Sequence, residues 1–250
     1  MEINKYWTNK GYSSGFGDLI NQISYDYTNT TEPTTINWCL QPRTNRQVKR
    51  VLNFFKPNDL ITHQFKNFTQ TDEPPIGQHP HDYWPAKLLH KGGDYIAIWL
   101  YIKHKSKSTH HQDKVADRTL IEMMIRAFKA NGYKVVIVPS LGPNETIYNI
   151  EYDFDQYGYM LSDFLRNCKF LICSEGGIAH LARLMRVPTL VYFNQTQSWK
   201  GHEFDLNDFW TTKYSRPIHK LTATVAQLAE QLICNQQVGG SSPLGSSTGH

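Results

Sequence analysis

One turn in the second half of the chain carries residues suited to binding an anion. The segment Ser174-Glu-Gly-Gly177 follows the apolar run Cys168-Lys-Phe-Leu-Ile-Cys173, and a helical pattern begins at about Ile178. Two adjacent glycines let the backbone turn sharply and approach a ligand, because neither has a Cβ. The free N–H groups and the positive dipole end of the following helix favour a diphosphate there. The alternative is an ordinary tight turn between a strand and a helix.

A second stretch rich in glycine lies near the start of the chain. The sequence Tyr12-Ser-Ser-Gly-Phe-Gly-Asp-Leu-Ile20 predicts a turn built on Ser14, Gly15 and Gly17. It lacks the third glycine of the dinucleotide-binding fingerprint, and no acidic residue follows clearly at the required spacing. A dehydrogenase that transfers a hydride is therefore disfavoured.

The carboxylate of Asp18 directly follows this second turn. A helical pattern runs from Leu19 to about Tyr27, so Asp18 is expected at the beginning of a helix. Capping of the helix is the commonest use of an aspartate there. A carboxylate in this place can also act as a base.

A basic loop follows the first strand of the second half. The strand, Tyr95-Ile-Ala-Ile-Trp-Leu-Tyr-Ile102, is uniformly apolar, which predicts a central strand buried on both faces. The loop Lys103-His-Lys-Ser-Lys-Ser-Thr-His-His-Gln-Asp-Lys114 then lies at the end where such sheets bind ligands, and its lysines could meet a diphosphate. The alternative is a solvated basic loop.

Strands and helices alternate along the chain, which indicates a parallel, doubly wound sheet. Strands are expected at 35–40, 60–68, 95–102, 133–139, 168–173 and from 188 to 193, with a short additional one at 147–154. Helices are expected at 19–27, 120–131 and 160–166, from 178 and at 225–233, and the stretch 45–55 is amphipathic and basic. The proline-rich stretch 71–85 reads as a linker or long loop.

Composition places the chain among ordinary globular proteins. Its 250 residues are 40% hydrophobic and 19% charged, and no stretch approaches the roughly 20 apolar residues of a membrane span. The start, Met1-Glu-Ile-Asn-Lys5, lacks the features of a signal peptide, so we expect a cytoplasmic location. The formal charge of +4 mildly favours an anionic partner. The four cysteines show no paired spacing, and neither disulfides nor zinc is implied.

Two motifs together resemble a known enzyme family. Ser174-Glu-Gly-Gly-Ile-Ala-His-Leu-Ala182, followed by Val187-Pro-Thr-Leu-Val191, resembles the donor-site signature of the heptosyltransferases, family 9 of the glycosyltransferases. Ser13-Ser-Gly-Phe-Gly-Asp-Leu19 is similar to the Gly-Asp turn near the start of that family. The resemblance implies a GT-B-like α/β fold of two small Rossmann-like parallel-sheet units that face a central cleft, closed by a C-terminal helix. It implies an acceptor-side unit at 1–88 and a unit that binds a nucleotide sugar at 89–235. The composition of the last residues, which are small and polar from Gly239 on, predicts a disordered or cloning-derived tail at 236–250.

The resemblance also implies roles for individual residues. Asp18 corresponds to the family's aspartate after the first glycine turn and would act as the general base for an acceptor hydroxyl. Gly176 and Gly177 would hold the diphosphate through backbone N–H groups, Ser174 would lie nearby, and Glu175 would contact the ribose. His180 would touch the phosphate or the sugar, with a buried structural histidine as the alternative. The residues expected to bind the donor are Ser174, Glu175, Gly176, Gly177, His180, Lys103 and Lys105.

Three functions remain open at this stage. The first is an inverting, metal-independent transfer of a sugar from a nucleotide-diphosphate donor to a glycan hydroxyl, without a cofactor. The second keeps the enzyme and replaces the acceptor with a hydroxymethylated base in DNA, which would suit the basic stretch Arg43–Lys56. The third is a module that binds a nucleotide sugar without turnover.

The pairs His79/His81 and His110/His111 have no acidic or cysteine partner at a familiar spacing, so no metal site is predicted. The donor sugar, the nucleotide base and the oligomeric state are not determined.

Overall fold

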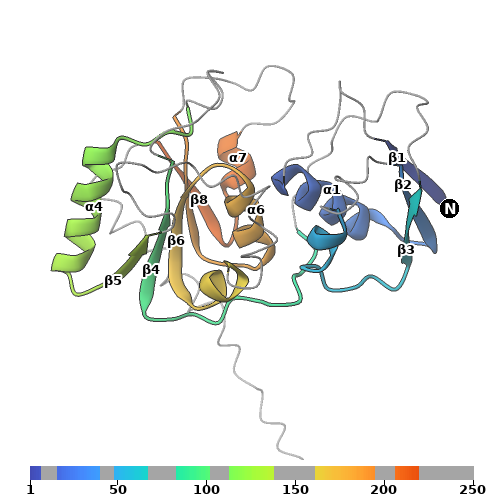
Figure 1. Cartoon of the computed structure of the whole chain (residues 1–250), viewed down its shortest axis with the longest axis horizontal. Helices are drawn as coiled ribbons and strands as arrows, with labels where there is room; N and C mark the ends of the chain where they lie inside the picture. The colour runs from blue at the N-terminus through green and yellow to red at the C-terminus, as the bar shows by residue number, and fades with distance from the viewer. Residues whose placement is uncertain are drawn as a thin grey trace, which may run out of the picture.

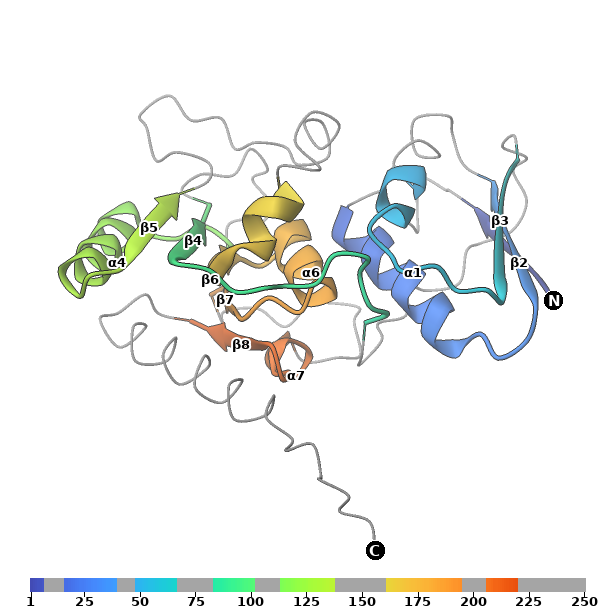
Figure 2. The same cartoon turned by 90° about the horizontal axis from the view of Figure 1, so that it is seen from below.

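The protein is described from a computed structural model, which describes residues 1–6, 16–39, 48–66, 83–101, 113–137, 161–194 and 206–219. In this part of the chain the strands form two separate parallel sheets (Figure 1). Helices α1 (Phe16–Asn29) and α6 (Gly177–Leu184) lie side by side between the sheets, as both Figure 1 and Figure 2 show. The prediction of two α/β units with parallel sheets is confirmed.

The N-terminal sheet has the strand order β1-β2-β3. Its strands are β1 (Glu2–Tyr6), β2 (Thr34–Cys39) and β3 (Ile61–Lys66), and β2 pairs with both neighbours in parallel. Helix α1 connects β1 to β2, and a short helix at 48–52 lies between β2 and β3 in the sequence.

The C-terminal sheet has the strand order β5-β4-β6-β7-β8. All neighbouring pairs are parallel. The strands are β4 (Tyr95–Trp99), β5 (Lys134–Ile137), β6 (Cys168–Ser174), β7 (Thr189–Tyr192) and β8 (Ser215–Ile218). The remaining helices of this unit are α4 (Arg118–Ala130), a helix at 161–166 and α7 (Leu206–Trp210).

Successive residues of the central strands pack on opposite faces of the larger sheet. Ile96 and Ile98 of β4 belong to the hydrophobic cluster that contains Phe128 of α4. Ala97 and Trp99 belong to the cluster that contains the apolar residues of α6. Because both faces are covered, β4 must be apolar throughout, and its prediction as a central strand is confirmed.

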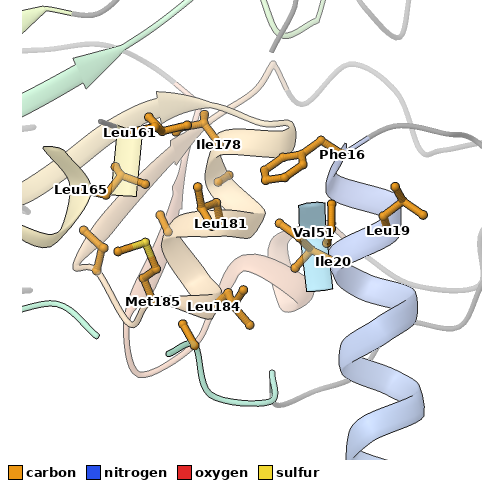
Figure 3. Packing of buried hydrophobic residues seen from close by; sticks show 14 of the residues in the cluster. Phe16, Leu19, Ile20, Val51, Leu161, Leu165, Ile178, Leu181, Leu184 and Met185 are labelled. Atoms are coloured by element: carbon orange, nitrogen blue, oxygen red, sulfur yellow. The ribbon is translucent and has the colours of Figure 1, made fainter. Parts of the chain in front are cut away.

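The apolar side chains of α1 and α6 join the two units. Figure 3 shows Phe16 and Ile20 on the side of α1 that faces Ile178 and Leu181 of α6, and all four belong to one hydrophobic cluster. The side chains of Ile20, Ile178 and Leu181 are fully buried. Burial of each such side chain contributes about 1.5–3 kcal/mol relative to exposure. The helix pair therefore fixes the first turn of α1 against the C-terminal unit.

Some predictions differ from the structure. Strands β1 and β8 and helix α7 were not expected from the sequence. Helix α1 begins at Phe16 instead of Leu19, so the prediction of Gly17 as a turn residue is wrong: Gly17 lies in the first turn of the helix. The strand expected at 147–154, the final helix expected at 225–233, the tail and most of the linker lie outside the described residues. The boundary between 88 and 89 falls between β3 and β4 and stays a prediction.

Among the helices that the structure describes, none combines the length and the apolar character needed to cross a lipid bilayer.

Candidate functional site

The carboxyl ends of β4 and β6 form the point where the larger sheet changes direction. From β4 the chain crosses through α4 to β5 on one side, whereas β7 and β8 follow β6 on the other side. Open parallel sheets bind ligands at such a switch point. Ser174 ends β6 there, and its hydroxyl oxygen accepts a hydrogen bond from the N–H of Tyr101 at 2.9 Å. The hydroxyl donates to the carbonyl of Lys114 at 2.8 Å, so Ser174 ties three segments together at this edge.

The turn after β6 has the backbone geometry that favours glycine. Gly176 has a φ of +149°, a conformation that residues with a side chain rarely adopt. A Cβ on Gly176 would lie 3.3 Å from the hydroxyl oxygen of Tyr101. As the N-cap of α6, Gly176 also has no side chain to accept a hydrogen bond from the first turn. The N–H of Ala179 donates to the carbonyl of Gly176 at 3.0 Å, whereas no side chain caps the N–H groups of Gly177 and Ile178 that precede it, and an anion can bind there.

The first helical turn of α1 packs against the first helical turn of α6, next to Gly176 and Gly177. A Cβ on Gly177 would lie 3.0 Å from Cδ1 of Phe16 and 3.6 Å from the backbone nitrogen of Gly17. Asp18 is the next residue of α1 and is half-buried. Two helix starts, each with a partial positive charge, thus converge beside one carboxylate. A negatively charged donor and a base can be brought together here.

Glu175 is held in a buried ion pair. Its Oε2 atom lies 2.6 Å from Nζ of Lys114, and its Oε1 atom lies 3.7 Å from Nε2 of His180. Burial alone would raise the pKa of Glu175, but the ammonium of Lys114 and the adjacent His180 lower it well below its usual value. Glu175 is therefore ionised, and its carboxylate is paired with the ammonium of Lys114 inside the protein.

His180 connects this ion pair to the N-terminal unit. Its Nδ1 atom lies 2.6 Å from the hydroxyl of Tyr83, which also hydrogen-bonds the side-chain oxygen of Asn21 in α1. Burial raises the pKa of Tyr83, Arg183 opposes this shift, and Glu175 and Asp18 add to it. The charges of Glu175 and Asp18, which belong to different units, therefore both act on this one hydroxyl.

The structure brings together most of the site residues predicted from the sequence. The buried position of His180 agrees with the structural alternative for this histidine, and the contact of Glu175 with a ribose stays a prediction. Ser14, Gly15, Lys103 and Lys105 lie outside the described residues, as do the histidines at 79, 81, 110 and 111, most of the basic loop 103–114 and the start of the basic stretch 43–56. The predicted residues that meet at the helix starts are Gly17, Asp18, Ser174, Glu175, Gly176, Gly177 and His180.

Sequence reasoning missed three residues of this site. Lys114 is the last residue of the predicted basic loop, and it is this lysine that reaches the glycine turn. Tyr83 lies near the end of the proline-rich stretch 71–85, and Asn21 lies within helix α1; no local sequence pattern marks either residue as part of a site. Only their contacts with His180 and with each other reveal them.

A cluster of potential metal ligands is not found at this site. Within the part of the chain that the structure describes, no three side chains of His, Cys, Asp or Glu are grouped as metal ligands would be. The prediction of a metal-independent site remains to be tested.

Solved structures with a similar fold are glycosyltransferases. No protein-family model and no curated protein sequence matches the chain. The bacterial iron-containing dodecameric glycosyltransferase TibC from enterotoxigenic E. coli H10407 matches with a TM-score of 0.53 and 11% identity. The match covers 96% of this chain and 80% of TibC.

The chain has the fold of a GT-B glycosyltransferase. The E. coli heptosyltransferase WaaC, solved with ADP-2-deoxy-2-fluoro heptose, matches at a TM-score of 0.43 and 11% identity. This match covers 94% of this chain and all of WaaC. The similarity to TibC extends across both α/β units, so the two parallel-sheet units implied by the sequence motifs are confirmed, whereas the closing C-terminal helix lies outside the described residues.

Proposed function

We propose that the protein is a glycosyltransferase that moves a sugar from a nucleotide-diphosphate donor to a hydroxyl of a glycan, with inversion and without a metal. The observation that supports this most directly is the meeting of the two helix starts. The uncapped turn at Gly176 and Gly177 lies against the first turn of α1, which carries Asp18. A site for a departing diphosphate and a base thus lie side by side.

The reaction follows from this arrangement. The backbone N–H groups that begin α6 bind the diphosphate and stabilise the negative charge that develops as it leaves. Asp18 takes the proton of the acceptor hydroxyl, whose oxygen attacks the anomeric carbon from the side opposite the diphosphate. The bond between the anomeric carbon and the diphosphate oxygen breaks as the new glycosidic bond forms. One such displacement inverts the anomeric configuration.

Donor binding is tested by thermal shift with nucleoside diphosphates and their sugars. A donor present at 100 times its Kd should stabilise the folded chain by about 2.7 kcal/mol, because it binds only the native state. Gly176→Ala should weaken this response, since the turn would be strained. Gly132→Ala is the matched control: Gly132 has a φ of +81° but lies at the end of α4, away from the turn.

Transfer is tested by mass spectrometry of candidate acceptors incubated with the stabilising donor, with and without EDTA. Addition of one sugar residue to a glycan acceptor supports the proposal. Addition only to hydroxymethylated DNA would identify the alternative acceptor. Donor binding without any product on either acceptor would identify a binding module, and a response equal in Gly176→Ala and the parent chain would contradict the proposed donor site.

A further inference from the structure

An unbroken series of polar contacts runs from the larger sheet to helix α1. Lys114 pairs with Glu175 at 2.6 Å, and Glu175 lies 3.7 Å from His180. The other ring nitrogen of His180 lies 2.6 Å from the hydroxyl of Tyr83, which in turn hydrogen-bonds Asn21. Both α/β units therefore contribute to one network, and Tyr83 is the residue where it passes from α6 to α1.

Neighbouring side chains hold Tyr83 in place. Its ring is nearly parallel to that of His180, with centroids 6.2 Å apart and an interplanar angle of 5°. The guanidinium of Arg183, one turn further along α6, lies 4.5 Å from the centroid of the Tyr83 ring. The hydroxyl donates its one proton to the side-chain oxygen of Asn21, so it accepts a hydrogen bond from Nδ1 of His180. Loss of the hydroxyl would remove both contacts and leave the ring packing intact.

Asn21, which Tyr83 contacts, lies on the same face of α1 as Asp18. Asn21 follows Asp18 by three residues, and residues three apart lie on the same face of a helix. Gly17 allows α1 to approach α6 closely, because a Cβ at this position would lie 2.5 Å from Cδ2 of His180. The hydroxyl of Tyr83 thus links the donor-binding end of α6 to the face of α1 that carries the proposed base.

We propose that Tyr83 and Asn21 are positioning residues for the transfer reaction: their hydrogen bond, anchored on His180, sets the rotation of α1 and so the direction in which Asp18 faces the start of α6. This inference rests on the proposed function. Neither residue exchanges a proton with the substrate. Their effect on the rate is exerted through Asp18.

The test compares two Tyr→Phe variants. Tyr83→Phe should lower kcat about 10- to 100-fold, because small displacements of a catalytic group cost this much, while KM for the donor and the thermal shift stay close to those of the parent chain. Tyr95→Phe is the matched control, since the Tyr95 hydroxyl donates to the carbonyl of Phe164 at 2.5 Å, in the C-terminal unit and away from α1. It should leave kcat unchanged. An equal loss in both variants, or no loss in Tyr83→Phe, would overturn the inference.

A double variant separates positioning from general destabilisation. In an Asp18→Asn background, Tyr83→Phe should have almost no further effect on kcat, because a residue that acts through Asp18 has nothing left to position. If the fold-decrease in kcat of the double variant equals the product of the decreases in the two single variants, Tyr83 does not act through Asp18.

Amide hydrogen exchange tests whether Tyr83 restrains α1 without requiring enzymatic activity. Tyr83→Phe should speed amide exchange in residues 16–24 of α1 relative to Tyr95→Phe, since a contact that restrains this helix is lost. If the parent chain transfers no sugar but the exchange difference is present, the proposed function fails while the restraint of α1 stands. If the exchange rates are equal, Tyr83 does not position α1, whatever the activity.

Discussion

Gly17 of α1 and His180 of α6 approach so closely that only a glycine fits between the two helices. A Cβ on Gly17 would lie 2.5 Å from Cδ2 and 3.1 Å from Nε2 of the imidazole. Glycine in a helix costs roughly 1 kcal/mol relative to alanine, so its presence in the first turn of α1 requires a reason. The reason is close packing between the units: this glycine lets the start of α1 reach the start of α6.

The first prediction concerns this contact. Gly17→Ala should lower the free energy of unfolding by about 1–3 kcal/mol, because the added methyl group overpacks a buried contact. Urea denaturation measures the change. In a His180→Ala background the space is open, and the same substitution should be neutral or stabilising by up to about 1 kcal/mol through helix propensity. A stabilising effect in the parent chain would show that the two helices are further apart.

The second prediction concerns the buried ion pair. Lys114→Met should destabilise the protein by about 3–5 kcal/mol, because the carboxylate of Glu175 would remain buried without its cation. The double variant Lys114→Met/Glu175→Gln should recover much of this loss in urea denaturation. Lys134→Met serves as the control, since Lys134 and Asp94 form an exposed pair at 3.5 Å that is worth at most about 1 kcal/mol. Equal effects of the two single variants would contradict a buried pair.

Local sequence patterns were sufficient for the elements that carry the site. The apolar run ending at Ser174, followed by two glycines, predicted both β6 and α6, because strand burial and helix initiation each leave a local pattern. Asp117 and Gly132 likewise delimit α4: the Asp117 carboxylate accepts a hydrogen bond from the N–H of Leu120 at 3.1 Å, and Gly132 has a φ of +81° just after the helix.

Contacts between distant segments could not be predicted in this way. Tyr83 and His180 are 97 residues apart, and nothing near either residue indicates the other. Strand β8 was missed because it contains Pro217, which is compatible with a strand only at a sheet edge, and its edge position is known only from the fold. Gly17 was assigned to a turn because its closest partner, His180, belongs to the other unit.

The third prediction concerns pH. The ring of His63 accepts a hydrogen bond at Nδ1 from the indole N–H of Trp38 at 3.0 Å, and its Nε2 lies 2.9 Å from the hydroxyl of Tyr27. Burial lowers the pKa of His63 from 6.5 to about 4, whereas burial and then the charge of Asp26 raise the pKa of Tyr27 to about 12. As the pH falls from 6.5 toward 4, the unfolded chain binds a proton that the folded chain does not, so stability falls in this window.

His63→Gln checks this pH dependence. Glutamine keeps an acceptor and a donor but does not titrate. The free energy of unfolding should therefore depend less steeply on pH in the variant than in the parent chain between pH 6.5 and 4, as measured by urea denaturation at several pH values. Parallel curves for the two proteins in this window would show that His63 does not contribute.

The last prediction concerns the proposed base. Asp18→Asn should lower kcat about 10²- to 10⁴-fold, because asparagine cannot take the proton of the acceptor hydroxyl. The amide nearly matches the carboxylate in shape, so the thermal shift caused by the donor should persist. Asp208→Asn, in the first turn of α7, is the control and should retain the parent rate. An unchanged rate in Asp18→Asn would assign the base to another residue. Loss of the donor's thermal shift together with the rate would instead place Asp18 in donor binding, because a base that acts only on the acceptor leaves the donor complex intact.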